Sequence, residues 1–393
     1  MRPGQHGFSL VEVTIAMGLT MAVTASIFAT MHPAQGAFMT EPERADMQQR
    51  LRVAVDTLTK DLMMAGAGSY LGAQPGSLVH YFAPVLPFRR NVSVDDPVGT
   101  VRTDTITLIS VPITAAQTTL TADLPPAALT MQVAAQSGCA AGVNLCGFAA
   151  GITVLVYDAG GNHDTFTLTD VTDAASQLTL ARSSTMQESP YMSTTTYKAG
   201  SIVVEAKVDT YYLKTDIRTQ SFQLMHDDSA ANAGVPVVDH IVGLTFDYYG
   251  EPQAPILTSG GTTYGPAPPS LGMRTTAYPA GENCAFQIDA TSGRQVSRLP
   301  PLSTTTTLVP LTAAQLADGP WCPDEMSANR WDADLLRIRT VGVTIRVEAA
   351  LAALRGPAGV LFTNGGTSRA ATRWVADQEI RLLVSPRNVN LGR

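Results

Sequence analysis

Hydrophobic residues are distributed unevenly along the chain. The segment from Phe8 to Met31 is almost continuously apolar, whereas residues 1–7 before it are short and mostly polar and end in Gly7. As an α-helix rising about 1.5 Å per residue, the apolar segment would reach roughly 36 Å, enough to cross a bilayer. An ordinary secretory signal has its small residues after the apolar run, whereas in this chain Gly7 lies before it. We therefore expect residues 8–31 to form a membrane-spanning helix.

The residues that follow this segment predict an interruption of the helix and then a second helical stretch. Pro33 and Gly36 predict a kink or break in the helix. Beyond them the apolar positions have helical spacing, at Met47, Leu51, Val55, Leu58 and Leu62. The opposite face is predicted to carry Arg44, Arg50, Arg52, Asp56, Lys60 and Asp61. We expect residues 32–68 to be an amphipathic continuation that packs on a sheet and ends at the glycines of 66–68.

From residue 69 to residue 393 the pattern becomes a series of short apolar runs, some alternating with polar residues, between turn residues. Strands are expected at 104–111, 129–134, 152–158, 164–171, 177–181, 201–208, 211–214, 240–249, 338–349 and 374–385. Residues 250–330 are rich in Gly, Pro, Ser and Thr and are interpreted as loop insertions. Because the strands do not alternate with helices, the expected fold class is α+β with an antiparallel, β-rich domain.

Charge and composition exclude one class of partner. The chain has 26 Lys and Arg against 33 Asp and Glu, a net charge of −7, and only 15% of its residues are charged. A protein that binds the phosphate backbone needs a basic surface. Nucleic acid is therefore not an expected partner.

The four cysteines favour disulfide bonds in an exported domain. They are Cys139, Cys146, Cys284 and Cys322, and no two have the two-residue spacing of a zinc knuckle or a thioredoxin site. Three pairings are open, as is the reduced state. We expect the sequence-local pairs, 139 with 146 and 284 with 322.

No pattern in the chain indicates a catalytic centre or a cofactor site. The six histidines have no close metal-ligand spacing, and there is no G-x-S-x-G elbow. Acidic pairs such as Asp227-Asp228 offer oxygen ligands for calcium but do not repeat the alternation of an EF-hand loop. We expect a protein that is not an enzyme, with no catalytic residue, no metal site and no cofactor.

A single carboxylate stands out in the apolar segment. Glu12 lies about one turn inside it, where an unpaired charge in lipid costs on the order of a few kcal/mol. The surrounding residues, Gly7-Phe8-Ser9-Leu10-Val11-Glu12, resemble the cleavage and methylation motif of type IV prepilins. The resemblance implies that residues 1–7 are a leader, that a prepilin peptidase cuts between Gly7 and Phe8, and that Phe8 becomes N-methylated.

The same resemblance implies an assembly role. Phe8 and Glu12 would mediate subunit assembly, with the Glu12 carboxylate pairing with the amino terminus of a neighbouring subunit. The pilin arrangement also implies one long amino-terminal helix, its first half in the membrane and its second half on a β-rich domain. The expected location is the inner membrane, in a single pass with a cytoplasmic leader and a periplasmic domain, and later a filament. Expected partners are the prepilin peptidase, other major and minor pilins or pseudopilins, and an unidentified surface ligand of the loops.

Four further segments narrow the resemblance within the pilins. Residues 52–68, 238–249, 336–347 and 378–388 are similar in order and pattern to passages of PilW-like minor pilins and GspJ-like pseudopilins. A PilW-like minor pilin that acts in type IV pilus assembly or initiation is the function that this favours. A GspJ-like minor pseudopilin of a type II secretion system is the alternative. A membrane-tethered periplasmic enzyme or binding module is a third reading.

Overall fold

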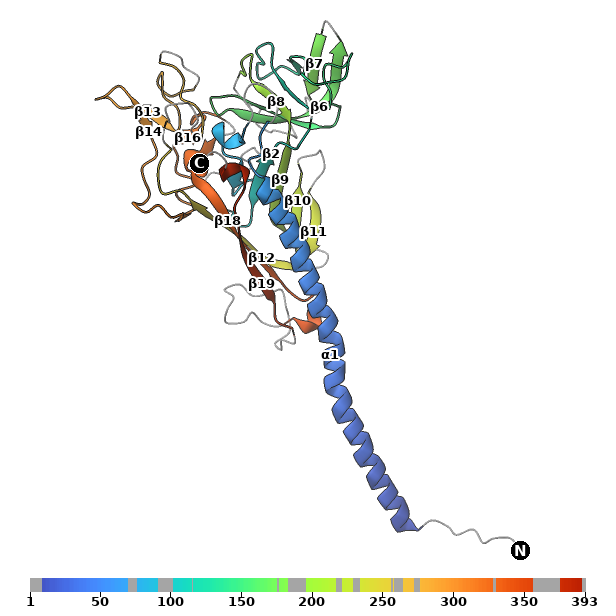
Figure 1. Cartoon of the computed structure of the whole chain (residues 1–393). Coiled ribbons are helices and arrows are strands. Elements are labelled where there is room, and N and C mark those ends of the chain that lie inside the picture. The colour runs from blue at the N-terminus through green and yellow to red at the C-terminus, as the bar shows by residue number, and fades with distance from the viewer. Residues whose placement is uncertain are drawn as a thin grey trace. The chain divides into compact units, whose positions relative to one another are not determined.

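The computed structural model describes residues 9–69, 76–90, 102–114, 116–174, 177–182, 196–216, 221–228, 234–255, 257, 264–271, 276–327, 330–355 and 375–390 (Figure 1). Within these ranges the chain has one long α-helix, several 3₁₀ turns and antiparallel sheets, so its class is α+β. Contact density divides the chain into two units, residues 1–50 with 347–378, and residues 51–346 with 379–393.

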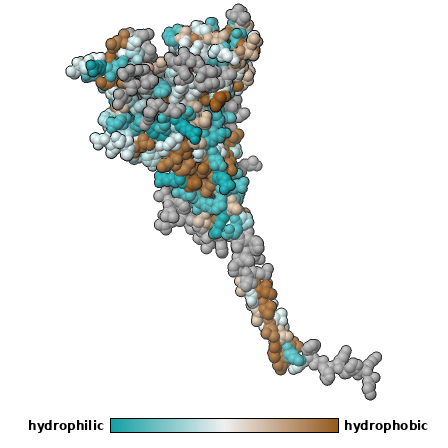
Figure 2. All heavy atoms as spheres, in the orientation of Figure 1, coloured by the Kyte–Doolittle hydropathy of each residue, from teal (hydrophilic) through white to brown (hydrophobic). Residues whose placement is uncertain are grey.

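Helix α1 runs without interruption from Leu10 to Met64. The predicted break at Pro33 and Gly36 is therefore wrong, because a proline removes only one backbone donor and the turns on either side keep theirs. The stretch Leu10–Ala29 is long and apolar enough to span a membrane, and none of it is buried within the chain. Figure 2 shows its side chains as a brown band along the helix.

The carboxyl-terminal part of α1 is amphipathic, as its spacing predicted. One face of the helix is fully buried at Ala54, Leu58 and Leu62. The exposed face carries Arg52, Asp56 and Lys60. The helix ends at Met64, four residues earlier than predicted, because Gly66 takes a left-handed φ of +83°. A Cβ at Gly66 would also lie 2.9 Å from the Val389 side chain, so glycine is needed there for space as well.

The smaller unit joins the middle of α1 to residues 347–355. Glu43 is buried, and its carboxylate accepts a hydrogen bond from the Ala350 amide. Arg355 follows the short turn η3 (Ala352–Leu354), pairs with Glu348 at 3.1 Å and donates to the carbonyl oxygens of Ala349 and Ala350. This buried arginine therefore closes the segment on itself.

The larger unit is built on a five-stranded antiparallel sheet in the order β1-β2-β9-β10-β11. Its strands are β1 (Val85–Pro87), β2 (Ile106–Ser110), β9 (Lys207–Asp216), β10 (Ser221–Asp227) and β11 (Val235–Asp239). The neighbours β2 and β9 pair from Ile106↔Tyr211 to Ser110↔Lys207. Everything from residue 111 to residue 206 is thus an insertion between two paired strands, called here the inserted module.

The inserted module has a sheet and a core of its own. Its strand order is β3-β8-β5-β6-β7-β4. The strands are β3 (Gln117–Thr119), β4 (Thr130–Gln132), β5 (Thr153–Tyr157), β6 (His163–Ala174), β7 (Gln177–Arg182) and β8 (Ile202–Glu205). A bridge between Leu120 and Val133 joins its two edges, so the sheet closes like a small barrel. Buried residues that include Met131, Val154 and Leu180 fill the interior.

One expected strand, 201–208, is two strands in the structure. β8 belongs to the inserted module and β9 to the five-stranded sheet, with Ala206 between them. An alternating pattern can continue through such a change of sheet, so periodicity alone does not show the division. The hairpin predicted between 152–158 and 164–171 is confirmed, since β5 and β6 pair from Thr153↔Thr167 to Tyr157↔His163.

A four-stranded sheet in the order β15-β12-β18-β19 completes the β structure. Its strands are β12 (Ile241–Gly250), β15 (Val309–Leu311), β18 (Ile338–Val347) and β19 (Gln378–Val384). Residues 250–330 are predicted as loops, but the described part of this region contains four short strands. β13 (Phe286–Ile288) and β14 (Gln295–Ser297) form a hairpin, and β15 joins the four-stranded sheet. The fourth, β16 (Trp321–Cys322), pairs with β17 (Trp331–Asp332). Strands of two or three residues are too short for an alternating pattern, so the sequence did not reveal them. The remaining 3₁₀ turns are η1 (Leu78–His80), η2 (Ala333–Arg337) and η4 (Asn388–Asn390).

Candidate functional site

Glu12, the carboxylate singled out in the apolar segment, lies in the first turn of α1. Its Oε2 accepts a hydrogen bond of 3.0 Å from the Ser9 backbone amide, and the Ser9 hydroxyl accepts one of 3.3 Å from the Val11 amide. Ser9 and Glu12 thus form a capping box, in which a negative charge also suits the helix amino terminus. The spacing Ser-x-x-Glu in the sequence is the signal of this cap. Gly7 and Phe8, the predicted cleavage site, lie outside the described residues.

The exposed stretch that follows Glu12 keeps its polar groups satisfied within the helix. The hydroxyls of Thr20 and Thr24 each donate at 2.7 Å to the carbonyl oxygen four residues earlier. The Thr14 hydroxyl donates at 2.9 Å to the carbonyl oxygen of Val11, three residues earlier. Since these hydroxyls need no outside partner, the surface of Leu10–Ala29 is effectively apolar, which is what a lipid or helix-packed environment requires.

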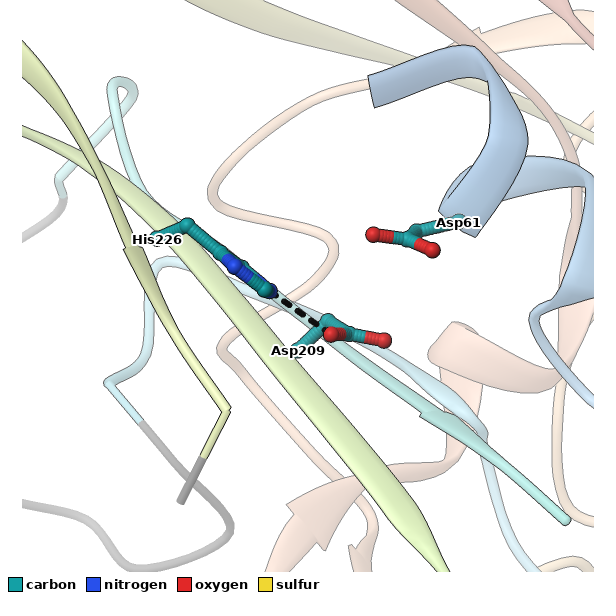
Figure 3. A group of neighbouring side chains, drawn as sticks. All are labelled: Asp61, Asp209 and His226. Atoms are coloured by element: carbon teal, nitrogen blue, oxygen red, sulfur yellow. Dashed lines mark hydrogen bonds and ion pairs between the residues drawn. The ribbon is translucent and has the colours of Figure 1, made fainter. Parts of the chain in front are cut away.

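A second polar group of interest lies where α1 packs on the five-stranded sheet (Figure 3). Lys207, Asp209 and Tyr211 alternate along β9, so their side chains share one face. Asp61 reaches this face from α1, and the Lys207 ammonium donates at 2.9 Å to an oxygen of Asp61 and at 2.9 Å to one of Asp209. Tyr211 also donates to Asp61. Asp61 therefore lies on the buried face of the helix, and its predicted place on the polar face is wrong.

His226 joins the same group from β10. It lies directly opposite Tyr211 in the strand pairing, and the two rings stack with centroids 4.7 Å apart. Figure 3 shows the imidazole pointing at Asp209, with a distance of 2.7 Å between Nε2 and a carboxylate oxygen. Asp61, Lys207, Asp209, Tyr211 and His226 are called the helix–sheet cluster below.

The charges in the helix–sheet cluster set the protonation of its members. The hydrogen bond to Asp209 raises the pKa of His226 above its ordinary value. Burial lowers the pKa of Lys207, but the hydrogen bonds and charges of Asp61 and Asp209 outweigh it and leave that pKa raised. Burial and the bond to Asp61 raise the pKa of Tyr211. When His226 is protonated, two cations balance two carboxylates.

The helix–sheet cluster has the donor types of a metal site but already contains a cation of its own. Ligand atoms of Asp61, Asp209 and His226 lie within 4.8 Å of one another. The Lys207 ammonium, however, is hydrogen-bonded to both carboxylates and supplies the positive charge that a metal ion would bring. What this arrangement does chemically is to fasten the carboxyl-terminal part of α1 to β9 and β10.

Both disulfides join cysteines that are close in sequence. Cys139 is bonded to Cys146, and Cys284 to Cys322, so the four cysteines form the two pairs that we had expected. The first bond closes a turn in the inserted module, where Asp173 also binds the Asn144 amide at 2.8 Å. The second bond links Cys284, two residues before the β13–β14 hairpin, to Cys322 in β16, and so ties together two parts of the 250–330 region.

Another buried carboxylate lies close to the second disulfide. Asp332 accepts hydrogen bonds from the Gly319 amide at 2.6 Å and the Asp334 amide at 2.8 Å, while Asp334 pairs with buried Arg337. Burial raises the pKa of Asp332 to about 7, against the opposing effect of these two amides. Asp332 therefore changes charge near neutral pH.

The sequence patterns gave no hint of the helix–sheet cluster because its members are far apart along the chain. One signal was available, since Asp61 follows Leu58 by three residues and therefore shares its buried face.

Comparison with known proteins gives no match to this chain, whether with family models, curated sequences or solved structures.

Proposed function

We propose that the chain is a minor pilin of the PilW-like type, which acts in the assembly or initiation of a type IV pilus. The proposal is carried by one observation, a carboxylate near the amino end of an exposed apolar helix, immediately after a prepilin-like cleavage motif. The continuous helix supports it, because a subunit that polymerises through its amino-terminal helix needs an apolar rod joined to a domain outside the membrane.

The capping box suggests how Glu12 is accommodated before assembly. Its carboxylate is bound to the Ser9 amide, so part of the cost of placing it at the membrane is met within the chain. Cleavage after Gly7 places the new amino terminus next to Ser9. In a filament the Glu12 carboxylate then pairs with the amino-terminal charge of a neighbouring subunit, and two opposite charges compensate each other's burial.

The helix–sheet cluster supports the same function from the other end of the helix. Assembly through α1 pulls on the link between this helix and the exported domain. Two residues of β9, Lys207 and Tyr211, hold that link because both donate hydrogen bonds to Asp61 of the helix. In this proposal the carboxyl-terminal part of α1 and the five-stranded sheet move together.

The amino-terminal processing is tested by mass spectrometry of the protein extracted from membranes, with and without the prepilin peptidase of the cell. We expect a mature chain that starts at N-methylated Phe8 and a chain that keeps residues 1–7 when the peptidase is absent. A start at Met1 in both cells, or cleavage near Ala34, rejects the pilin pathway and leaves a membrane-tethered enzyme or binding module as the better proposal.

Glu12→Ala tests the assembly role, with Glu41→Ala as the matched control. Glu41 is an exposed carboxylate on the same helix outside the apolar stretch, in a weak surface pair with Arg44. We expect normal membrane levels of both variants but loss of pilus assembly with Glu12→Ala alone. Equal assembly of the two variants contradicts the proposal.

The alternative from the family resemblance is a GspJ-like minor pseudopilin of a type II secretion system. It predicts the same processing at Phe8, so the peptidase experiment does not separate the two. Deletion of the chain does, because a minor pilin is needed for surface pili and a pseudopilin for release of exported enzymes into the medium. Loss of secretion with normal pili selects the alternative.

A further inference from the structure

A cavity of about 580 Å³ lies between the inserted module and the segment after α1. Four stretches of the module line it, residues 117–119, 134–137, 157–159 and 198–202, together with Ser69 and Tyr81 from the segment after α1. The volume lies inside the range of roughly 300–1,000 Å³ that is common for small-molecule sites. None of its lining residues belongs to the helix–sheet cluster.

The strand edge beside this cavity is already occupied. The Ala134 amide donates to the Thr119 carbonyl oxygen at 2.9 Å, and the Gln136 side chain donates to the Gln117 carbonyl oxygen at 2.9 Å. These bonds extend the seam that closes the six-stranded sheet. An extended peptide that bound by adding a strand would need those backbone groups, so this cavity does not suit a peptide.

The charged groups around the cavity already have hydrogen-bond partners within the chain. The Asp158 carboxylate accepts hydrogen bonds from the Gly160 amide at 2.9 Å and from the Asn162 side chain, so its oxygens stabilise the turn that follows it. Lys198, at the exposed rim, donates at 2.8 Å to Asp123. A charged ligand would have to compete with these contacts, which favours a neutral ligand.

The remaining lining combines fixed amides, hydroxyls and one accessible aromatic ring. Gln117 is held by hydrogen bonds from the Ser69 hydroxyl at 2.7 Å and to the Thr114 carbonyl oxygen at 3.3 Å. Tyr81 is half-buried, and the ring of Tyr157 meets it edge-on at 4.9 Å. The Tyr157 hydroxyl is buried and makes no hydrogen bond within the described residues, although the Ser69 backbone lies close enough to influence its pKa.

We propose that this cavity binds a neutral saccharide of one or two rings. A sugar ring has an apolar C–H face that packs on a tyrosine and hydroxyl groups that pair with amides and side-chain hydroxyls. The exposed hydroxyl residues Thr119 and Ser137 lie in the same lining. The inference does not depend on the proposed pilin function, since it rests on the inserted module and the segment after α1.

The test is a titration of the purified full chain with neutral sugars, followed by ligand-observed NMR. The detergent must have no sugar headgroup, and the panel includes glucose, galactose, mannose, N-acetylglucosamine, lactose and cellobiose. We expect at least one of them to bind with a dissociation constant below about 10 mM. No binding of any panel sugar at that concentration overturns the proposal.

Two tryptophan substitutions locate the site. Ala135 is exposed and lines the cavity, whereas Ala140 is exposed in the neighbouring disulfide turn and does not. We expect Ala135→Trp to fill the cavity and weaken sugar binding at least about tenfold, and Ala140→Trp to leave it unchanged. Equal affinities of the two variants overturn the proposal, and because both positions are exposed, neither change disturbs a core.

A third variant tests the charge of the ligand. If inorganic phosphate or an acidic sugar binds instead, and this binding disappears with Lys198→Gln, the ligand is an anion and the neutral-saccharide proposal is wrong. These measurements do not involve pilus assembly, so their failure leaves the proposed function standing.

Discussion

The Lys207 ammonium lies 2.9 Å from a carboxylate oxygen of Asp61, a residue that belongs to the helix whose other end is the apolar membrane candidate. Asp61 is buried, whereas the Lys207 side chain is 42% exposed. A half-exposed ammonium retains part of its hydration, so the pair avoids the full cost of burying two ions. This contact ties a strand of the five-stranded sheet to α1.

Asp61→Asn should destabilise the larger unit. The substitution removes the charge that compensates Lys207, and we expect a loss of about 1–3 kcal/mol in the free energy of unfolding, less than for a fully buried pair because Lys207 reaches water. Denaturant unfolding of the detergent-solubilised chain measures it. Asp56→Asn, at an exposed position on the same helix, is the control and should change the free energy by less than about 0.5 kcal/mol.

His226 should make stability depend on pH. Its folded pKa is raised above the ordinary value of 6.5 by Asp209, with Asp61 adding to the shift and Lys207 opposing it. The folded state then binds the proton more tightly, so this contribution is complete below pH 6.5 and is lost as the pH rises through the folded pKa. His226→Gln should flatten the stability profile in that window. An unchanged profile would show that the imidazole is not coupled to folding.

Asp332 should act in the same direction but for a different reason. Its folded pKa of about 7 exceeds the ordinary value of 3.8, so the folded state binds more protons between these values and stability falls as the pH rises through them. The slope from this one group is at most about 1.4 kcal/mol per pH unit. Asp332→Asn should remove it, as measured by thermal unfolding from pH 4 to about pH 8. Asp318→Asn, at an exposed position nearby, should retain most of the slope.

The two disulfides should differ in their effect on stability. Their cysteines are 38 and 7 residues apart, and loop entropy alone gives about 4 kcal/mol for Cys284–Cys322 and about 2 kcal/mol for Cys139–Cys146. Replacing both cysteines of each pair by serine, and comparing urea midpoints, tests this order. A larger loss for the shorter loop would mean that native contacts, and not chain entropy, dominate there.

Local patterns predicted the parts of this fold that depend on local physics. Each of three features depends on residues that are close together in the sequence: the apolar run, the stripe ending in Leu58 and Leu62, and the β5–β6 hairpin. The pairing of Cys284 with Cys322 also followed from order along the chain. Glu12 was noticed because a carboxylate in an apolar run is costly, but its bond to Ser9 was not foreseen.

Most of the parts that the sequence does not predict depend on how separate segments of the chain meet. A lone aspartate on a helix is expected to face solvent. Asp61 is buried instead because it pairs with Lys207, which lies 146 positions later in the chain. The closure of the inserted module depends on the Leu120–Val133 bridge between two strand edges, and no period in the sequence encodes such a meeting. Long-range register of this kind follows only from the packed structure.

The inserted module leaves the five-stranded sheet at Ser110 and returns at Lys207, two residues that face each other across β2 and β9. An insertion whose ends are neighbours adds no strain to its host, whatever its length or shape. A shorter or longer module between the same two residues is therefore compatible with the same contacts of Asp61 and Tyr211. The geometry leaves the size of the module free while it fixes the two positions at which the module begins and ends.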